Sequence, residues 1–399
     1  MNIIYLLNTT SPSAGSSKSF AGLLKEVMKA GHKVKVIVPD ENGVAITLRK
    51  NGIDVIALHY IFGMRPYSKT LKDKLIFPAR YLRLKLLNYL ASRRLDKIAS
   101  EFKADIFHAN SSVTEIGYLS AKRLGKPHIS HVREYGMKDH HMHILGLHKR
   151  LYGKNNFNIC ITKDILKYQG LENSRNSCVI YNPIASMKDM RFFPNKEDYI
   201  LYVGRLDPTK GIEDMIGGYI RYCQTSDKPM RLLLAGKYYN FRHIPMIERL
   251  KKELKDASLE NMVEWLGERN DVADLMSKAK LVVVTSFFEA FGRVMPEAIT
   301  NGALVAARDT GGSHEQFENG LAHSGGEIGL RFMDVNGLAD CIGRAASMSE
   351  EEYYSFVERG QKTVKAFYSK EVSAKSVLDF YDKVLQMQKG QVVKSLINK

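Results

Sequence analysis

The chain has 399 residues, of which 44% are hydrophobic and 26% charged, as in soluble globular proteins long enough for two domains. Its formal net charge of +16 is uneven, because residues 1–195 carry +17 and residues 196–399 carry −1. The absence of a ~20-residue apolar run, of a signal-peptide pattern and of paired cysteine spacing excludes membrane-spanning and disulfide-stabilised classes. We therefore expect a cytoplasmic protein whose first half faces an anionic partner.

Short apolar segments alternate with helical patterns along the whole chain. In the first half they span 2–7, 34–38, 54–58, 105–109, 158–162 and 178–182, and in the second half 199–204, 231–236, 262–267, 281–286 and 303–307. Apolar strands separated by helices are typical of parallel sheets covered on both faces. This alternation predicts an α/β fold with two Rossmann-like domains.

The domain boundary is expected within 181–199, a stretch with two prolines and little periodicity. We predict a first domain over 1–190 and a second over 191–370. The last long helical pattern, 371–388, has one apolar face and is expected to pack back on the first domain.

The most informative basic stretch predicts a helix over 78–103, with Pro78 in its first turn. Its apolar face consists of Leu84, Leu87, Ala91, Leu95, Ile98 and Phe102, and its basic residues lie mostly off that face. A surface helix packed on a sheet explains this pattern, and so does a basic surface that contacts anionic lipid. Both interpretations stay open, because the apolar face can pack inward while the basic flank meets a membrane.

The segment EAFGRVMPE, residues 289–297, lies between an apolar strand and a helix that is expected to begin near Arg293. A helix N-terminus attracts phosphate, and Gly292 allows a ligand to approach the backbone closely. Glu289 and Glu297 are poor phosphate ligands but good acceptors for sugar hydroxyls. Together these residues favour a ligand that has both phosphate and sugar, namely a nucleotide sugar.

Two further segments follow strands of the second half. In YVGRLDPTKG, Gly204 ends the strand, and Arg205 and Lys210 are placed to bind a diphosphate at the strand's carboxyl end. In DTGGSHEQF, the paired glycines Gly311 and Gly312 would allow close backbone approach to a ligand.

In chain order the three motifs are GRLDPTKG, EAFGRVMPE and DTGGSHEQF, and over about 199–317 they resemble the donor-binding domain of retaining glycosyltransferases of family 4. That family has the GT-B architecture, two facing Rossmann-like domains with the active site in the cleft between them. The resemblance implies metal-independent transfer, without a cofactor, from a nucleotide sugar, with UDP favoured over GDP. The acceptor is expected to be lipid-linked or an oligosaccharide in capsule, exopolysaccharide or lipopolysaccharide synthesis.

The resemblance also implies roles for residues of the second half. Arg205 and Lys210 would bind the diphosphate and stabilise its charge, Glu289 would contact the donor sugar, and Glu297 would hold the ribose hydroxyls. The backbone of EAFGRVMPE would support the diphosphate, and the turn at 265–269 would contact the base. These backbone contacts are assigned to Phe291, Gly292, Arg293 and Val294, and to Leu266, Gly267 and Glu268.

The first half is expected to bind the acceptor and an anionic membrane surface at the inner face of the cytoplasmic membrane. The loop 8–20 resembles the family's glycine-rich loop, although paired glycines are missing, and a plain flexible loop explains it equally well. Catalytic candidates of the first half lie in the segment 126–143. They are His131, Arg133 and Glu134, and the sequence does not rank them against one another. Acceptor-binding candidates are Ala14, Gly15, Ser16, Asn110, Ser111, Ser112, Arg133, Glu134 and Asp139.

Several alternatives were weighed against glycosyl transfer. A metal site at His140, His141, His143 and His148 is disfavoured because these residues lie in a loop-like stretch. A glycosidase would leave Arg205 and Lys210 without a role. A sugar-nucleotide epimerase of the same architecture and a non-enzymatic nucleic-acid or membrane binder remain as second choices, although no nucleic-acid-binding signature occurs.

Overall fold

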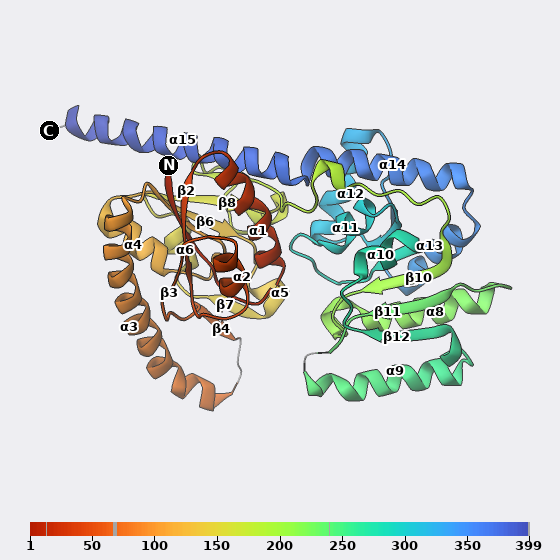
Figure 1. Ribbon diagram of the computed structural model, residues 1–399. Helices are drawn as coiled ribbons and strands as arrows, with labels where there is room; N and C mark the ends of the chain where they lie inside the picture. The colour runs from red at the N-terminus through yellow and green to blue at the C-terminus, as the bar shows by residue number, and fades with distance from the viewer. Residues whose placement is uncertain (13, 67–69, 239, 398–399) are drawn as a thin grey trace. The chain divides into compact units, whose positions relative to one another are not determined.

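The computed structural model describes residues 1–12, 14–66, 70–238 and 240–397, without the side chains of Pro66, His140 and 391–397. The chain forms two compact units (Figure 1). Unit 1 comprises Met1–Pro183 and Lys370–Lys399, and unit 2 comprises Ile184–Ser369. Unit 2 is therefore continuous in sequence, whereas unit 1 is completed by the end of the chain.

Unit 1 is built on a seven-stranded sheet in the order β3-β2-β1-β5-β6-β8-β9, and all of its pairings are parallel. The strands are β1 (Asn2–Leu6), β2 (Lys33–Val38), β3 (Val55–Ala57), β5 (Ile106–Ala109), β6 (His128–Val132), β8 (Asn156–Cys160) and β9 (Ser177–Val179). A separate antiparallel pair joins β4 (Met64–Pro66) and β7 (Met142–Ile144). Parallel strands with helical crossovers are confirmed for this half of the chain.

Helices cover both faces of the first sheet, since successive side chains of a strand point to opposite faces. Ile3 and Tyr5 of β1 pack with α1 and α15, whereas Ile4 and Leu6 pack with α3 and α4. The helices are α1 (Gly15–Lys29), α2 (Val44–Lys50), α3 (Leu71–Phe102), α4 (Ile116–Leu124), α5 (Met137–His140), α6 (Leu147–Leu151), α7 (Lys163–Tyr168) and α15 (Lys370–Ile397).

Helix α3 differs from its prediction at the N-terminus. It begins at Leu71, and Pro78 lies inside it rather than in the first turn. The earlier start is stabilised by Thr70, whose Oγ1 accepts a hydrogen bond from the backbone N–H of Asp73 at 3.3 Å. The acidic Asp73 also suits the positive end of the helix dipole. This capping pattern outweighs the preference of proline for a first turn.

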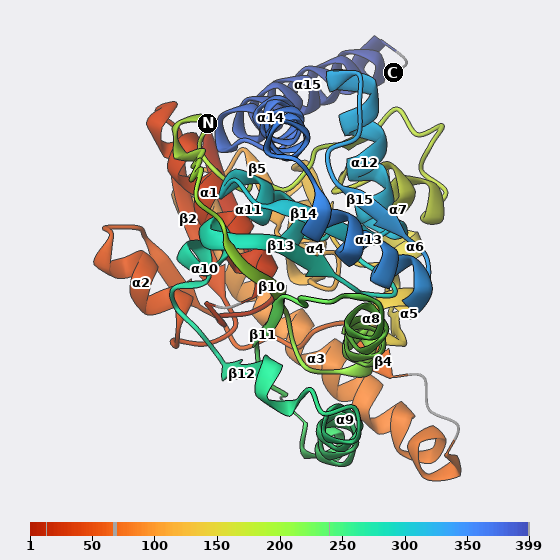
Figure 2. The ribbon, with the colours of Figure 1, turned by 90° about the vertical axis from the view of Figure 1, so that its right-hand side faces the viewer.

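Unit 2 contains a six-stranded parallel sheet in the order β12-β11-β10-β13-β14-β15. Its strands are β10 (Glu197–Val203), β11 (Arg231–Ala235), β12 (Val263–Gly267), β13 (Ala279–Val284), β14 (Leu304–Arg308) and β15 (Leu330–Phe332). Its α-helices are α8 (Ile212–Thr225), α9 (Ile244–Asp256), α10 (Val272–Lys278), α11 (Val294–Thr300), α12 (Gly311–Ser324), α13 (Val335–Ser347) and α14 (Glu350–Phe367). Short 3₁₀ turns are η1 (Met187–Asp189), η2 (Pro208–Lys210), η3 (Phe241–His243) and η4 (Glu260–Met262). Figure 2 shows the same ribbon turned by 90° about the vertical axis, with the right-hand side of Figure 1 toward the viewer.

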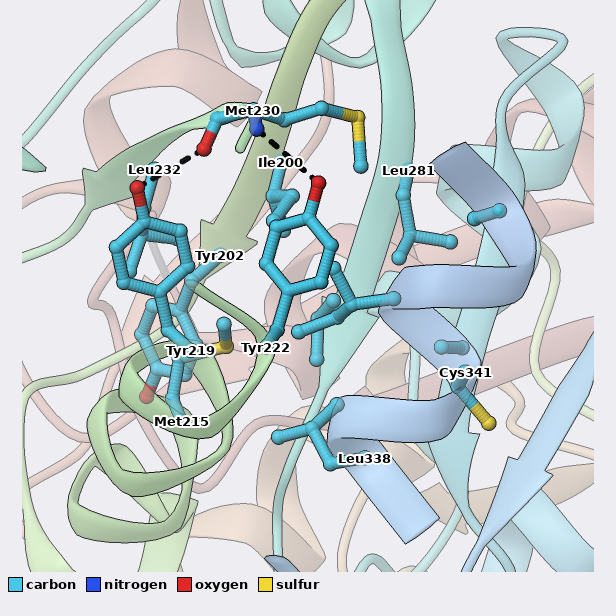
Figure 3. Close-up of a cluster of buried hydrophobic side chains, with 14 of the residues drawn as sticks. Ile200, Tyr202, Met215, Tyr219, Tyr222, Met230, Leu232, Leu281, Leu338 and Cys341 are labelled. Carbon is cyan, nitrogen blue, oxygen red and sulfur yellow. Dashed lines mark hydrogen bonds between the residues drawn. The ribbon is translucent and has the colours of Figure 1, made fainter. Parts of the chain in front are cut away.

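The core of unit 2 joins α8 and α13 to one face of the sheet, as Figure 3 shows. The hydroxyl of Tyr219 donates to the carbonyl of Met230 at 2.9 Å, and the N–H of Met230 donates to the hydroxyl of Tyr222 at 3.1 Å. These buried tyrosines therefore keep their polar atoms satisfied while their rings fill the core. The packing fixes β10, whose carboxyl end carries the predicted ligand-binding residues Gly204, Arg205 and Lys210.

Within the described residues, no helix combines the length and apolar content needed to cross a membrane. The four cysteines, all described, are free thiols.

Candidate functional site

The predicted donor-binding segments of unit 2 meet at one edge of its sheet. Strand β13 pairs with β10 on one side and with β14 on the other, and all three run parallel. The segments 204–211, 285–293 and 309–311 follow these strands, so they gather at the carboxyl edge, where ligands bind in open α/β sheets. The topology thus brings together motifs that are far apart in sequence.

The turn after β10 is fixed by its own residues and by β13. Asp207 caps η2 by accepting from the N–H of Lys210 at 3.2 Å, and it lies 3.2 Å from the Nε of Arg205. Gly211 has a φ of +66°, and an added Cβ would lie 2.2 Å from the carbonyl oxygen of Thr285. The Thr285 hydroxyl also donates to the carbonyl of Lys210 at 2.8 Å. Glycine is required here because the turn and the loop after β13 are in direct backbone contact.

Two ion pairs link the predicted cations and carboxylates. The Nζ of Lys210 lies 2.6 Å from an oxygen of Glu289, and both side chains are mostly buried. The guanidinium of Arg293 lies 2.9 Å from an oxygen of Glu297, one helical turn further on. Arg205 is more exposed, with 53% of its side chain accessible. The arrangement therefore presents one accessible guanidinium beside two cation–carboxylate pairs.

The loop between β13 and α11 is attached to the start of α12. The N–H of Gly312 donates to the carbonyl of Glu289 at 2.7 Å, and the amide of Gln316 donates to the carbonyls of Phe291 and Gly292. A Cβ on Gly312 would lie 2.4 Å from the Phe291 carbonyl oxygen. The paired glycines thus allow close approach of the protein's own loop. The predicted reason for these glycines was close approach of a ligand.

Helix α11 begins directly after the predicted phosphate-binding backbone. Arg293 is its N-cap residue, Val294 its first residue, and Glu297 lies in its first turn. Gly292, with a φ of +77°, occupies the left-handed region that favours glycine. The carboxylate of Glu297 is favourable at the positive end of the helix.

The segment predicted to contact a base follows β12, at the same edge of the sheet. The carbonyl of Gly267 accepts a hydrogen bond from the N–H of Gly236 at 2.8 Å, which ties this segment to the end of β11. Gly267 has a φ of +66°, and apart from its chain neighbours no atom of the described residues lies within 4 Å of the position of an added Cβ. Leu266 is partly exposed, and the exposed Glu268 forms an ion pair with Lys237. The backbone here has open space beside it.

In unit 1, the predicted acceptor-binding residues meet where β5 and β6 end. The Nε of Arg133 donates to the carbonyl of Asn110 at 2.7 Å, and Nη2 donates to the Asn110 side chain at 2.9 Å. The hydroxyls of Ser111 and Ser112 donate to the Glu134 carboxylate at 2.7 and 3.1 Å. Burial raises the pKa of Glu134 above its usual value, and the hydrogen bond from Ser111 opposes that rise. Burial thus makes this carboxyl group easier to protonate than one in water.

His131 is connected to the interior by a chain of polar side chains. Tyr5 and Tyr381 are joined through their hydroxyls at 2.8 Å, and the Tyr381 hydroxyl lies 2.5 Å from Nδ1 of His108. Nε2 of His108 lies 3.2 Å from Nδ1 of His131, which also lies 3.3 Å from Nη2 of Arg133. The sequence analysis missed His108 and Tyr381, because His108 read as part of a buried strand and Tyr381 as part of an apolar helix face.

The position of the proton on His131 follows from Arg133. A guanidinium only donates, so Nδ1 of His131 is the acceptor and the neutral ring carries its proton on Nε2. By the same logic, His108 donates through Nε2 and accepts from the Tyr381 hydroxyl at Nδ1. Burial lowers the pKa of both histidines well below the usual value, and the charge of Arg133 lowers it further. Among the described residues, Nε2 of His131 is buried without a hydrogen-bond partner.

The other predicted acceptor-side residues are placed less uniformly. The carbonyl of Ser16 accepts from the Asn110 side chain at 3.2 Å, which brings the start of α1 to the cluster, and Gly15 is exposed beside it. Asp139 accepts from the N–H groups of Tyr135 and Gly136 at 2.9 and 2.8 Å, so it stabilises the start of α5. The described residues contain no group of three potential metal ligands, and the side chain of His140 lies outside them.

Three kinds of comparison relate the chain to known proteins. Residues 185–362 match the family model described as glycosyl transferases group 1, which covers nearly all of unit 2. A Klebsiella pneumoniae protein, described as an uncharacterized 42.6 kDa protein in the cps region, is 24% identical over 79% of this chain and 87% of its own.

A second relative is a transferase of Campylobacter jejuni, named N-acetylgalactosamine-N,N'-diacetylbacillosaminyl-diphospho-undecaprenol 4-alpha-N-acetylgalactosaminyltransferase. It is 25% identical over 42% of this chain and 50% of its own. The crystal structure of HepE from Anabaena in complex with UDP has a TM-score of 0.75 and 18% identity, over 96% of this chain and all of that one. Residues 185–362 thus match the glycosyl transferases group 1 family, and the chain as a whole has the GT-B fold.

Proposed function

We propose that this protein is a retaining glycosyltransferase that moves a sugar from a nucleoside diphosphate donor to a lipid-linked glycan acceptor. The observation that carries the proposal is the grouping of Arg205 with the Lys210–Glu289 and Arg293–Glu297 pairs at one sheet edge. Cations suit a diphosphate, and carboxylates suit the hydroxyls of ribose and sugar. UDP is favoured over GDP, and the likeness to HepE, solved with UDP and with UDP-glucose, supports this choice.

The proposed chemistry depends on charge that develops on the leaving diphosphate. As the bond between sugar and diphosphate breaks, negative charge grows on the phosphate oxygens. Arg205 and Lys210 stabilise that charge, and the backbone N–H groups at the start of α11 support them. These cations supply the electrostatic role that a metal ion has in other transferases, so we propose a metal-independent reaction.

The ion pairs define how the donor would be received. The ammonium group of Lys210 now contacts Glu289 and would turn to the diphosphate, leaving Glu289 to accept a hydroxyl of the donor sugar. Glu297 would accept the ribose hydroxyls while Arg293 stays beside it. The base would rest on the backbone of Leu266, Gly267 and Glu268, and main-chain contacts of that kind do not by themselves identify the base.

Unit 1 would bind the acceptor at the ends of β5 and β6. Glu134 would accept a hydrogen bond from the attacking hydroxyl, and Nε2–H of His131 would donate to an oxygen of a bound sugar. The positive charge of the first half supports an acceptor that carries a lipid diphosphate at a membrane surface. The name of the Campylobacter relative, which includes a diphospho-undecaprenol, supports the same class. The cps-region relative supports capsule or a related polysaccharide as the product.

The proposal is tested by incubating the protein with individual UDP- and GDP-sugars and a set of polyprenyl-diphosphate-linked saccharides, without added metal and with a chelator. We expect one donor to yield a nucleoside diphosphate and a product in which the anomeric configuration is retained. The Lys210→Ala variant should lose this turnover, whereas Arg231→Ala, at the opposite edge of the same sheet, should keep it. An inverted product, an epimerised donor without transfer, or dependence on a metal would contradict the proposal.

A further inference from the structure

Helix α3 has an exposed apolar row that its own unit does not cover. Its inner side packs on the sheet through buried residues such as Leu84 and Leu95. Along the opposite side, five large apolar side chains are 52–72% exposed, namely Leu71, Leu75, Leu82, Leu86 and Tyr89. Single exposed apolar residues are ordinary, but these recur at helical intervals and form one continuous row. The first half of α3 also extends beyond the strands of its unit (Figures 1 and 2).

Basic residues border this apolar row on both sides. By helical periodicity, one border carries Lys72, Arg83, Arg94 and Lys97, and the other carries Lys74 and Lys85. The helix holds eight basic and three acidic residues in all. Lys85 forms an ion pair at 2.7 Å with Glu115, the N-cap residue of α4. Asp96 of α3 lies 3.4 Å from Arg93 and also pairs with Arg123 of α4 at 2.8 Å, so these two carboxylates face the rest of the unit.

An anionic bilayer is the partner that matches both features. A helix lying in the membrane interface buries its apolar row between lipid headgroups and places flanking lysines and arginines beside lipid phosphates. A second copy of the chain would cover the apolar row but would bring like-charged borders together. A nucleic acid would match the charges but would leave the row in water.

We propose that the outer side of α3, defined by Leu71, Leu75, Leu82, Leu86 and Tyr89 with their basic borders, is a docking surface for an anionic lipid bilayer. The helix lies in the plane of the interface, with its inner side still packed on unit 1. This inference deepens the proposed function and rests on it only for its biological purpose, which is access to a lipid-linked acceptor. Docking itself requires neither nucleotide nor acceptor.

The experiment is a flotation assay of the full-length protein with phosphatidylglycerol vesicles and with phosphatidylcholine vesicles. The docking variant combines Leu75→Ser, Leu82→Ser and Leu86→Ser, which change exposed positions and should leave the melting temperature unaltered. The control combines Ile46→Ser and Met333→Ser, two exposed apolar residues outside α3. A charge variant combines Arg83→Gln, Arg94→Gln and Lys97→Gln.

We expect the wild type and the control to float with phosphatidylglycerol vesicles and hardly with phosphatidylcholine vesicles. The docking and charge variants should each bind roughly tenfold more weakly, and added salt should reduce wild-type binding. Equal binding to both vesicle types, or unchanged binding by the docking variant, would overturn the proposal. So would a wild-type dimer that the docking variant converts to a monomer, or tighter binding to duplex DNA than to vesicles. A protein that floats as expected but transfers no sugar would leave docking intact and refute the proposed function.

Discussion

At the scale of single residues, the Lys210–Glu289 ion pair is the most informative contact at the carboxyl edge of the unit 2 sheet, where the donor is proposed to bind. Ion pairs with partial exposure add little to the free energy of unfolding, because desolvation and side-chain entropy offset most of the attraction. The pair is therefore poorly explained as a stabilising feature. In the proposed function, the pair is a cation held ready beside the position of a diphosphate, with a carboxylate that neutralises it until the donor binds.

The buried histidines predict a pH dependence of stability. In the unfolded chain a histidine gains a proton near pH ~6.5, whereas in the folded protein burial and Arg133 lower the pKa of His108 and His131 well below that value. The unfolded state therefore binds more protons as the pH falls below ~6.5, and the free energy of unfolding decreases toward acid pH. Tyr5 and Tyr381, which also face these rings, stay neutral in this range because burial raises the pKa of both hydroxyls.

We expect the free energy of unfolding, measured by urea denaturation, to fall steadily between pH 7 and pH 5. In the His108→Gln variant the slope should be smaller by up to about 1.4 kcal/mol per pH unit, which corresponds to one proton. Above pH 7 the two slopes should coincide, although the variant is less stable overall. Parallel curves at acid pH would contradict the assigned neutral state of His108.

At the scale of elements, the contact between α12 and the loop after β13 holds that loop in place at the carboxyl edge of the unit 2 sheet. Replacing Gly312 by alanine would place a methyl group 2.4 Å from the Phe291 carbonyl oxygen, so the loop or the helix must move. We expect a loss of about 1–3 kcal/mol in the free energy of unfolding together with weaker nucleotide binding. Thermal denaturation with and without nucleotide measures both effects.

The matched control for this change is Gly343→Ala in α13, where, outside the adjacent helix backbone, no atom of the described part of the chain lies within 4 Å of the added Cβ. Alanine is a better helix former than glycine, so this variant should be slightly more stable and bind nucleotide normally. If Gly312→Ala behaves like Gly343→Ala, the loop is not positioned by α12.

Tyr381 of helix α15 contacts His108, which in turn contacts the acceptor-side candidate His131. In Tyr381→Phe, Nδ1 of His108 loses its hydrogen-bond donor, which should cost about 1–3 kcal/mol of stability. Without that donor, His108 can change tautomer and stop donating to His131, so Tyr381 acts as a positioning residue. We expect kcat to fall while KM for the donor stays nearly constant.

Tyr219→Phe provides the control, because it also removes a buried hydroxyl, one that donates to the Met230 carbonyl in the core of unit 2. Both variants should be less stable, but only Tyr381→Phe should lose kcat at temperatures where both are folded. Equal kcat values would show that Tyr381 has a purely structural role.

At the scale of the whole molecule, unit 1 depends on the end of the chain. Helix α15 supplies Val377, Phe380, Tyr381 and Val384 to the core of unit 1, whereas unit 2 has a core made only from 184–369. A chain that ends at Ser369 should therefore retain a folded unit 2 and lose cooperative unfolding of unit 1. Calorimetry should show one transition for this chain and for the fragment 184–369. Two transitions in the truncated chain would show that unit 1 does not need α15.

Much of this architecture was predictable because buried parallel strands are visible as apolar runs, and because strand-end motifs predict which edge binds ligands. Strand β15, with only three residues, gave no such run. The pairing of Tyr381 with His108 spans 273 positions and involves residues that read as ordinary core. The predicted start of α3 at Pro78 was wrong, because the helix begins at Leu71, directly after the cap residue Thr70. Contacts that depend on tertiary packing, including the one between Gly312 and the loop after β13, leave no local pattern in the sequence.

The central claim is that unit 2 binds a nucleoside diphosphate through Arg205 and Lys210, and calorimetric titration with UDP, GDP and ADP tests it most directly. The account predicts that UDP binds more tightly than the other two, and that Arg205→Ala and Lys210→Ala each weaken UDP binding by roughly tenfold or more, since each removes a charge-assisted contact. Arg231→Ala, whose guanidinium pairs with Glu264 3.0 Å away at the opposite sheet edge, should bind UDP like the wild type. Undetectable binding of all three nucleotides to the wild type, or equal binding by Lys210→Ala and the wild type, would contradict the account.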